Sequence, residues 1–241
     1  MQRYFTNQIL KTGGVLEVQK SDTHHMKNVM RFQPDDTFEM VDADKNVFIC
    51  SVTEVNDSIQ YKVVSQESSD TELPVKVRII CPLLKGEKFE WMLQKTTELG
   101  ASEFVIYEAD RSIVKLDDKK RQKRLQRYEK VVKEASEQSK RLVIPRISFA
   151  AKLNHVDVSG DEEVYFAYED LSTDQSKALK KHMDNIESKK QIAFIFGPEG
   201  GFSEHEVKTA ENFENVRLGT RILRAETAPL YFLSAVSLIV D

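Results

Sequence analysis

Cysteine is scarce in this chain, which has only Cys50 and Cys81 among its 241 residues. Two cysteines are too few for a disulfide framework or for a structural zinc site. Neither a CxxC nor an HExxH pattern occurs, and the five histidines are scattered, so we expect no metal site. These absences favour a reduced, cytoplasmic protein.

Long hydrophobic runs are absent as well. The N-terminal residues MQRYFTNQIL lack the apolar core of a signal peptide, and no stretch reaches the roughly 18 apolar residues that a membrane helix needs. The most apolar segment, near the C-terminus, is interrupted by Ser234 and Ser237. With 40% hydrophobic and 31% charged residues, the composition is typical of a soluble globular protein of one or two domains with no membrane contact.

Positive charge is concentrated in one segment. The whole chain has a net charge of −4, but residues 115–141 contain eleven Lys or Arg against five Asp or Glu, a net charge of +6. A cationic segment on an acidic chain is typical of a directed contact with phosphate groups. A solvated helix with ion pairs four residues apart is an equally good explanation.

The first 72 residues are predicted to be rich in β-structure. Apolar and polar residues alternate over 37–41, 47–55 and 59–65, and a short helix is predicted over 22–31. We expect a small β-barrel of about six strands, followed by a polar linker over 66–72.

Strands and helices alternate after residue 73. Buried-type strands are predicted at 75–81, 104–107, 164–168 and 192–196. Helices are predicted at 86–99, from Asp117 or Asp118 to about 141, near 173–186 and near 204–213. This order predicts a mostly parallel sheet with helices on both faces, and therefore two domains, 1–72 and 73–241.

The densest motif is IAFIFGPEGGFSEHE, residues 192–206. A strand leads into GPEGG, and a helix follows whose start is specified by Ser203 and Glu206 as a capping box. Glycines at the carboxyl end of a strand allow a ligand to approach the backbone closely, at the edge where α/β sheets bind ligands. The spacing matches neither a P-loop nor GxGxxG, which disfavours a phosphate cradle.

A second motif, VRLGTRILRAETAPLYFLSAVSLIV, spans residues 216–240. A short strand is expected to reach Gly219, and Thr227 to cap a final helix with Pro229 in its second position. That helix is apolar nearly all round, so it should be buried against the sheet or a partner chain. Arg224 and Glu226, just before it, form either a structural ion pair or part of a site.

GPEGGFS, followed by LGTRILRAETA, closely resembles the C-terminal signature of the ribosomal RNA small subunit methyltransferase E family. These are SPOUT-class methyltransferases that act on N3 of a uridine in 16S ribosomal RNA. Two groups of residues resemble the family's first βα unit and its central helix: Lys85–Lys88, Gln94, Lys95 and Glu98–Gly100 for the first, and Glu134, Ala135, Glu137–Ser139, Arg141 and Pro145 for the second. His25, Val29 and Arg31 resemble an HxxxVxR element of its N-terminal domain. The resemblance covers nearly the whole chain.

The resemblance implies an α/β protein with an N-terminal PUA-like small β-barrel, residues 1–72, and a C-terminal SPOUT domain, residues 73–241, with a trefoil knot. It also implies a homodimer with S-adenosylmethionine bound in the knot. The residues expected to bind this cofactor are Leu171, Phe196, Gly197, Pro198, Glu199, Gly200, Gly201, Leu218, Gly219, Ile222, Leu223, Arg224, Thr227 and Ala228.

Methylation of uridine N3 requires loss of a proton and stabilisation of negative charge on the pyrimidine. Arg224 is expected to stabilise a charge on O2 or O4. Glu226 or Glu199 is expected to accept the proton, or only to orient Arg224.

The expected RNA partner is 16S ribosomal RNA within the small subunit. The residues expected to contact it are Arg3, His25, Lys27, Arg31, Arg111, Lys115, Lys120, Arg124 and Arg141. Two other functions stay open: methylation of another RNA, for instance at a ribose 2′-hydroxyl, and a non-catalytic RNA-binding factor in ribosome assembly. Nucleoside analysis of the product distinguishes N3 methylation of uridine from the first alternative. A titration with S-adenosylmethionine distinguishes an enzyme from the second.

Overall fold

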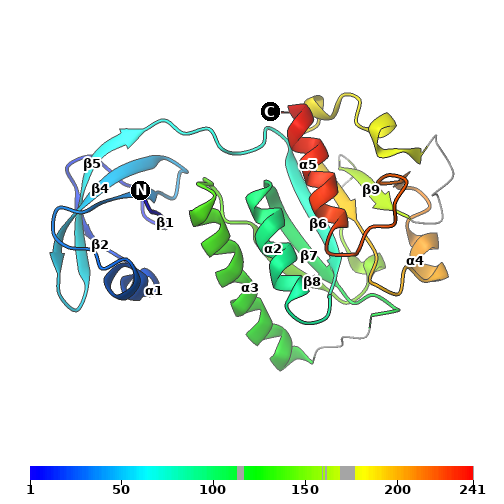
Figure 1. The fold of residues 1–241 in the computed structure, drawn as a ribbon, viewed down its shortest axis with the longest axis horizontal. Helices are drawn as coiled ribbons and strands as arrows, with labels where there is room; N and C mark the ends of the chain where they lie inside the picture. Colours follow the sequence, from blue (N-terminus) through cyan, green and yellow to red (C-terminus); the bar gives the residue numbers. More distant parts are fainter. Residues whose placement is uncertain (113–116, 159, 161, 169–176, 241) are drawn as a thin grey trace. The chain divides into compact units, whose positions relative to one another are not determined.

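The computed structural model describes residues 1–112, 117–158, 160, 162–168 and 177–240 (Figure 1). The chain forms two compact units: Met1–Glu72 with Ser136–Val143, and Leu73–Ala135 with Ile144–Asp241. The sequence division placed residues 136–143 in the second domain, whereas the structure places them in the first unit. The reason is local, because Glu72 accepts hydrogen bonds from the Arg141 guanidinium (2.5 Å) and the Leu142 amide (2.8 Å).

The first unit is built on a five-stranded sheet rather than the six or so strands expected, with strand order β1-β3-β4-β5-β2. β1 runs parallel to β3, and the other neighbours are antiparallel. The strands are β1 (Arg3–Phe5), β2 (Val15–Glu17), β3 (Thr37–Val41), β4 (Val47–Val55) and β5 (Ile59–Glu67). Two register shifts along β4 bend the sheet around its aromatic core.

Between β2 and β3, α1 (Lys20–His24) continues directly into a π-helical turn, His25–Val29. The predicted helix 22–31 therefore begins two residues earlier than expected and also ends earlier. It stops because Arg31 has a left-handed backbone (φ 56°) and Pro34 follows. The buried side chain of Met26 joins this segment to the core.

The second unit contains a six-stranded parallel sheet of order β11-β9-β10-β6-β7-β8. Its strands are β6 (Lys76–Pro82), β7 (Ala101–Tyr107), β8 (Arg146–Ala150), β9 (Glu163–Ala167), β10 (Gln191–Ile195) and β11 (Glu214–Val216). Central strands covered on both faces need continuous apolar runs, as in Ile79, Ile80 and Cys81 of β6, all fully buried. The predicted parallel sheet is confirmed.

Helices cover both faces of this sheet, also as predicted. One face is covered by α2 (Lys88–Glu98), α3 (Asp118–Gln138) and α5 (Ala228–Val240), and Figure 1 shows α5 beside α2. Phe232 of α5 stacks on Phe194 of β10 with ring centroids 4.3 Å apart. On the other face, α4 (Glu204–Thr209) follows Phe202, whose ring lies 4.2 Å from that of Phe166.

Several predicted helix boundaries need correction. α3 ends at Gln138 rather than near 141, because Lys140 has a left-handed backbone (φ 62°), and the helix predicted at 204–213 ends at Thr209. The helix predicted near 173–186 overlaps residues 169–176, which lie outside the described residues. The described remainder forms short 3₁₀ helices, Leu179–His182 and Ile186–Ser188. Strand β8 was not predicted, because its side chains are half-exposed and carry no buried-strand pattern.

Candidate functional site

A pocket of about 300 Å³ lies at the carboxyl ends of β9, β10 and β11, within the second unit. Three segments line it: residues 196–199 and 201–202 after β10, residues 217–226 after β11, and Ala167 with Tyr168 at the end of β9. Lys88, the first residue of α2, also lines it. This is the sheet edge at which open α/β folds bind ligands, and the volume suits part of a small organic ligand.

The loop after β10 is a tight turn joined to a well-specified helix start. The Gly201 amide donates to the Pro198 carbonyl (2.9 Å), and Gly201 has a φ of 70°, which a side chain would strain. The predicted capping box is confirmed: Ser203 Oγ accepts from the Glu206 amide (3.2 Å), and Glu206 Oε2 accepts from the Ser203 amide (2.8 Å).

The end of β7 holds this loop in place. The Tyr107 hydroxyl donates to the Phe196 carbonyl (3.1 Å), and burial raises the pKa of Tyr107 well above its usual value, so the hydroxyl keeps its proton. Ser203 Oγ donates to Asp110 Oδ2 (2.7 Å). Hydrogen bonds from Lys152 and then Ser203 hold the pKa of Asp110 below its usual range. One wall of the pocket is therefore fixed before any ligand binds.

The loop after β11 forms the opposite wall. Gly219 lines the pocket with a φ of 144°, a conformation that favours glycine. The Arg224 carbonyl accepts hydrogen bonds from the amides of Thr227 (2.9 Å) and Ala228 (3.1 Å), which turns the chain into α5. This turn places Arg224 and Glu226 at the pocket and leaves Thr227 next to the helix start.

Glu226 is the carboxylate built into the pocket wall. Its Oε1 lies 3.2 Å from Lys88 Nζ, and its side chain is 12% exposed. Its Oε2 is buried and has no hydrogen-bond partner among the described residues. Arg224 and Glu199 also line the pocket, but both are exposed. A buried carboxylate oxygen without a donor is costly, so a proton donor from a ligand would fit there.

Most residues predicted to bind the cofactor come together at this pocket. Those lining it are Phe196, Gly197, Pro198, Glu199, Gly201, Leu218, Gly219, Ile222, Leu223, Arg224 and Ala228. Gly200 and Thr227, also predicted to bind the cofactor, are not among the lining residues. At Gly200 an added Cβ would lie 3.2 Å from the Arg111 carbonyl oxygen. Leu171 lies outside the described residues.

The sequence analysis did not name several of the lining residues as site residues, among them Lys88, Tyr168, Phe202 and Arg217. Lys88 belongs to the KGEK segment that follows β6, and Tyr168 directly follows the buried strand β9. Because α/β sheets bind ligands at the carboxyl ends of their strands, both positions could have been predicted from the sequence. Phe202 and Arg217 lie within the two C-terminal motifs, but neither was singled out there as a site residue. Arg217 is 7% exposed, which makes it a buried cation in the pocket wall.

Two of the arginines expected to contact RNA are structural instead. Arg3 is 4% exposed, and its Nε lies 2.8 Å from Glu39 Oε2. Arg141 is 2% exposed and is paired with Glu72. Because these guanidinium groups are buried and already paired, we leave both arginines out of the RNA contact set.

The other residues of the first unit that were expected to contact RNA lie around the helical segment. The Tyr4 hydroxyl and His25 Nδ1 share a hydrogen bond of 2.9 Å, which gives this histidine a structural role. Lys27 is exposed, with its Nζ donating to the Asn56 carbonyl (2.7 Å), and Arg31 is exposed.

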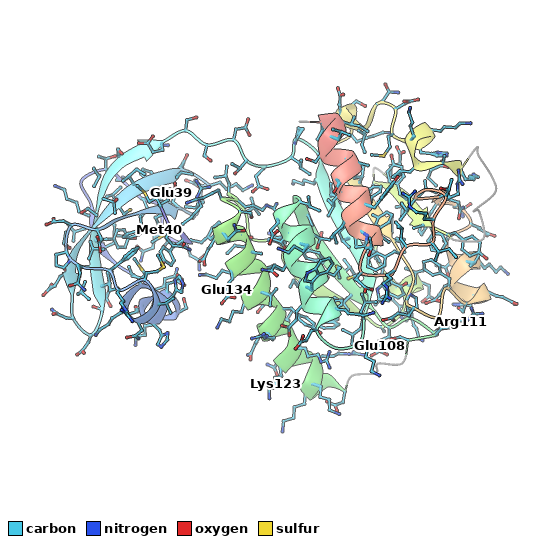
Figure 2. All side chains as sticks on the ribbon, in the orientation of Figure 1. Glu39, Met40, Glu108, Arg111, Lys123 and Glu134 are labelled. Carbon is cyan, nitrogen blue, oxygen red and sulfur yellow. The ribbon has the colours of Figure 1, made fainter. Side chains whose placement is uncertain are left out.

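Several of the basic residues of the second unit that were expected to contact RNA already make an ion pair or a hydrogen bond within the protein. Lys120 pairs with Asp117 (2.9 Å), Arg124 donates to the Tyr128 hydroxyl (3.1 Å), and Arg111 donates to the Gly200 carbonyl (3.3 Å). Lys115 lies outside the described residues. Within the described part of α3, the side chains of Lys119 and Lys123 are exposed and make no hydrogen bond or ion pair, and Figure 2 labels Lys123 on this helix.

Comparison with known proteins identifies the family. Residues 71–237 match a model described as the RNA methyltransferase domain, and residues 18–64 match the RNA methyltransferase PUA domain. The ribosomal RNA small subunit methyltransferase E of Bacillus subtilis (strain 168) is 38% identical, over 98% of this chain and 96% of that protein. This chain belongs to the ribosomal RNA small subunit methyltransferase E family.

Further relatives agree with this membership. Ribosomal RNA small subunit methyltransferase E 2 of Borreliella burgdorferi is 28% identical, over 88% of this chain and 86% of that protein. A crystal structure of a family member from Neisseria gonorrhoeae bound to S-adenosyl methionine is 25% identical, covers 99% of this chain and 98% of that chain, and has a TM-score of 0.87. The predicted fold, a PUA-like unit followed by a parallel α/β methyltransferase unit, is confirmed. The trefoil knot stays a prediction.

Two searches of the described residues were negative. No helix there is both long and apolar enough to cross a membrane. No group of three or more His, Cys, Asp or Glu side chains there is arranged to hold a metal ion.

Proposed function

We propose that this cytoplasmic protein transfers a methyl group from S-adenosylmethionine to N3 of a specific uridine in 16S RNA of the small ribosomal subunit. The observation that carries the proposal is the pocket at the ends of β9, β10 and β11, where Arg224 and Glu226 stand beside two glycine-containing loops. The Neisseria gonorrhoeae relative bound to S-adenosyl methionine supports the choice of cofactor.

The residues present fit this cofactor. Aromatic rings of Tyr168 and Phe202 line the pocket and suit a flat base, and the turns at Gly197, Gly201 and Gly219 bring backbone groups close to a ligand. When bound, S-adenosylmethionine supplies a methyl carbon made electrophilic by its positively charged sulfur. The protein's task is to position the uridine and to handle its charge and proton.

During transfer, the bond from N3 to the methyl carbon forms while the carbon–sulfur bond breaks, which leaves a neutral thioether. The N3 proton must go to a base. We assign Glu226 Oε2 as that base, because it is buried and without a donor, whereas Glu199 is exposed. Arg224 donates hydrogen bonds to pyrimidine O2 or O4, where negative charge develops.

The proposal is tested by two measurements on the purified protein. Calorimetric titration is expected to show one S-adenosylmethionine site per chain, and label from the methyl group is expected to enter the RNA of purified small subunits. Cofactor binding without transfer to that RNA would point to a different RNA substrate. Absence of cofactor binding would instead support a non-catalytic assembly factor, and either result overturns the proposal.

We expect the exposed lysines of α3 to contribute to RNA affinity through phosphate contacts. Replacing Lys119 and Lys123 together with alanine should weaken RNA binding and reduce the log–log salt slope by up to about two units on a duplex-like target. The maximal rate at saturating RNA should be unchanged. Fluorescence anisotropy across a salt series measures this.

Its matched control is the double variant Lys180→Ala with Lys208→Ala. These two exposed lysines lie outside the basic segment, so the variant removes the same charge elsewhere. If both double variants change the salt slope equally, the basic segment has no special role in docking.

We also propose that the protein is a homodimer whose interface includes α5. Among the residues of this apolar helix, Leu238 is 87% exposed, Tyr231 41% and Ile239 39%. Leu238→Glu should then shift the protein from dimer to monomer, because burying a charge in an apolar interface is costly. Light scattering measures the mass, and a wild-type mass of 27.7 kDa at micromolar concentration would contradict the proposal.

A further inference from the structure

Lys88 is an unusual first residue for a helix. The N-terminus of a helix carries partial positive charge, which disfavours a cation there. Lys88 nevertheless begins α2 and lines the pocket, with its side chain 42% exposed. Departures from local rules of this kind are expected at functional positions.

The partner of Lys88 explains its place. Nζ lies 3.2 Å from Glu226 Oε1, and Glu226 stands two residues before the start of α5, which packs beside α2. One carboxylate oxygen is therefore held by an ammonium group, and the other, Oε2, is buried without a partner among the described residues. The ion pair therefore fixes Oε1 of the carboxylate and leaves Oε2 available to a ligand.

We infer that Lys88 is a positioning residue, which holds Glu226 so that Oε2 faces the uridine N3 proton. This inference rests on the proposed function. Lys88 itself takes up no proton and touches neither substrate nor cofactor in this role. The N3 proton moves to Glu226 Oε2 as the bond from N3 to the methyl carbon forms and the carbon–sulfur bond breaks.

The decisive variant is Lys88→Met, which keeps the chain length and removes the charge. We expect kcat to fall roughly 10- to 100-fold, since a misplacement of about 1 Å can cost about 100-fold in rate. KM for S-adenosylmethionine and for the small subunit should stay unchanged. Lys88→Arg should restore most of the rate, because a guanidinium group can hold the same oxygen.

A second substitution separates positioning from other roles. In a Glu226→Gln background, Lys88→Met should have no further effect on kcat, because the group that it positions has lost its function. Lys95→Met is the matched control: Lys95 lies on the same helix, pairs with Glu98 at 2.8 Å and is outside the pocket lining, so this variant should keep the wild-type kcat. Cofactor titration of each variant establishes that the pocket is folded.

Three outcomes overturn the inference. A raised KM for the subunit with normal kcat would make Lys88 a phosphate contact, and a raised KM for S-adenosylmethionine would make it a cofactor contact. If Lys88→Met lowers kcat as much in the Glu226→Gln background as in the wild type, Lys88 does not act through Glu226. Failure of the proposed function looks different, because the wild-type protein itself would then transfer no methyl group to the subunit.

Discussion

Replacing Arg224 with alanine is expected to lower the rate of methyl transfer by roughly 100- to 1,000-fold, the loss found when one donor to a developing oxyanion is removed. Affinity for RNA should change little, because the proposed hydrogen bonds strengthen only as charge develops on the pyrimidine. Arg224 is exposed at the pocket, and the fold of its loop depends on its carbonyl rather than on its side chain. Single-turnover rates at saturating RNA, together with equilibrium RNA binding, measure the two quantities.

The control for this variant is Arg146→Ala. Arg146 is an exposed arginine on β8, outside the residues that line the pocket, so its loss should leave the rate at the wild-type level. A weaker RNA affinity with an unchanged maximal rate for Arg224→Ala would make Arg224 a docking residue and would contradict its catalytic role.

The second large effect is expected from Gly219→Val. Gly219 has a φ of 144°, and holding a β-branched residue there costs about 1–3 kcal/mol. The loop over 217–226 would relax away from the shape that lines the pocket. If the strain falls entirely on the binding-competent shape, affinity for S-adenosylmethionine falls by about 5- to 150-fold. Calorimetry measures this affinity.

The control is Gly13→Val, which introduces a similar backbone strain at a glycine outside the pocket. Gly13 has a φ of 88°, an added Cβ there meets nothing within 4 Å, and it lies in the first unit. This variant should lower the thermal unfolding temperature while leaving affinity for S-adenosylmethionine unchanged. If the two glycine variants bind S-adenosylmethionine with equal affinity, the Gly219 loop is not part of the binding site.

The parts of the fold that sequence predicted well are those set by local patterns. Apolar runs such as residues 192–196 predicted central strands because both faces of a parallel sheet are buried. The capping box of Ser203 and Glu206 fixed the start of α4. The helix predicted over 86–99 is α2, and Gly100 follows its end with a φ of 98°, in a place where a Cβ would lie 2.5 Å from the Leu73 side chain.

The parts that sequence did not predict depend on contacts between distant residues. Arg3 and Arg141 carry the charge typical of surface residues, yet both are buried and paired with Glu39 and Glu72. The pairing of Lys88 with Glu226 joins residues 138 positions apart. No spacing rule brings such residues together, because their meeting is a property of the completed sheet and its helices.

Identification of the modified nucleoside tests the central claim most directly. Small ribosomal subunits should be incubated with the protein and S-adenosylmethionine, and the RNA digested to nucleosides and analysed by mass spectrometry against standards. The proposed function predicts one N3-methyluridine per 16S RNA, absent when Arg224→Ala replaces the wild-type protein over the same time. A methyl group on a ribose or on another base would contradict the proposed function, and so would the absence of any methylated nucleoside.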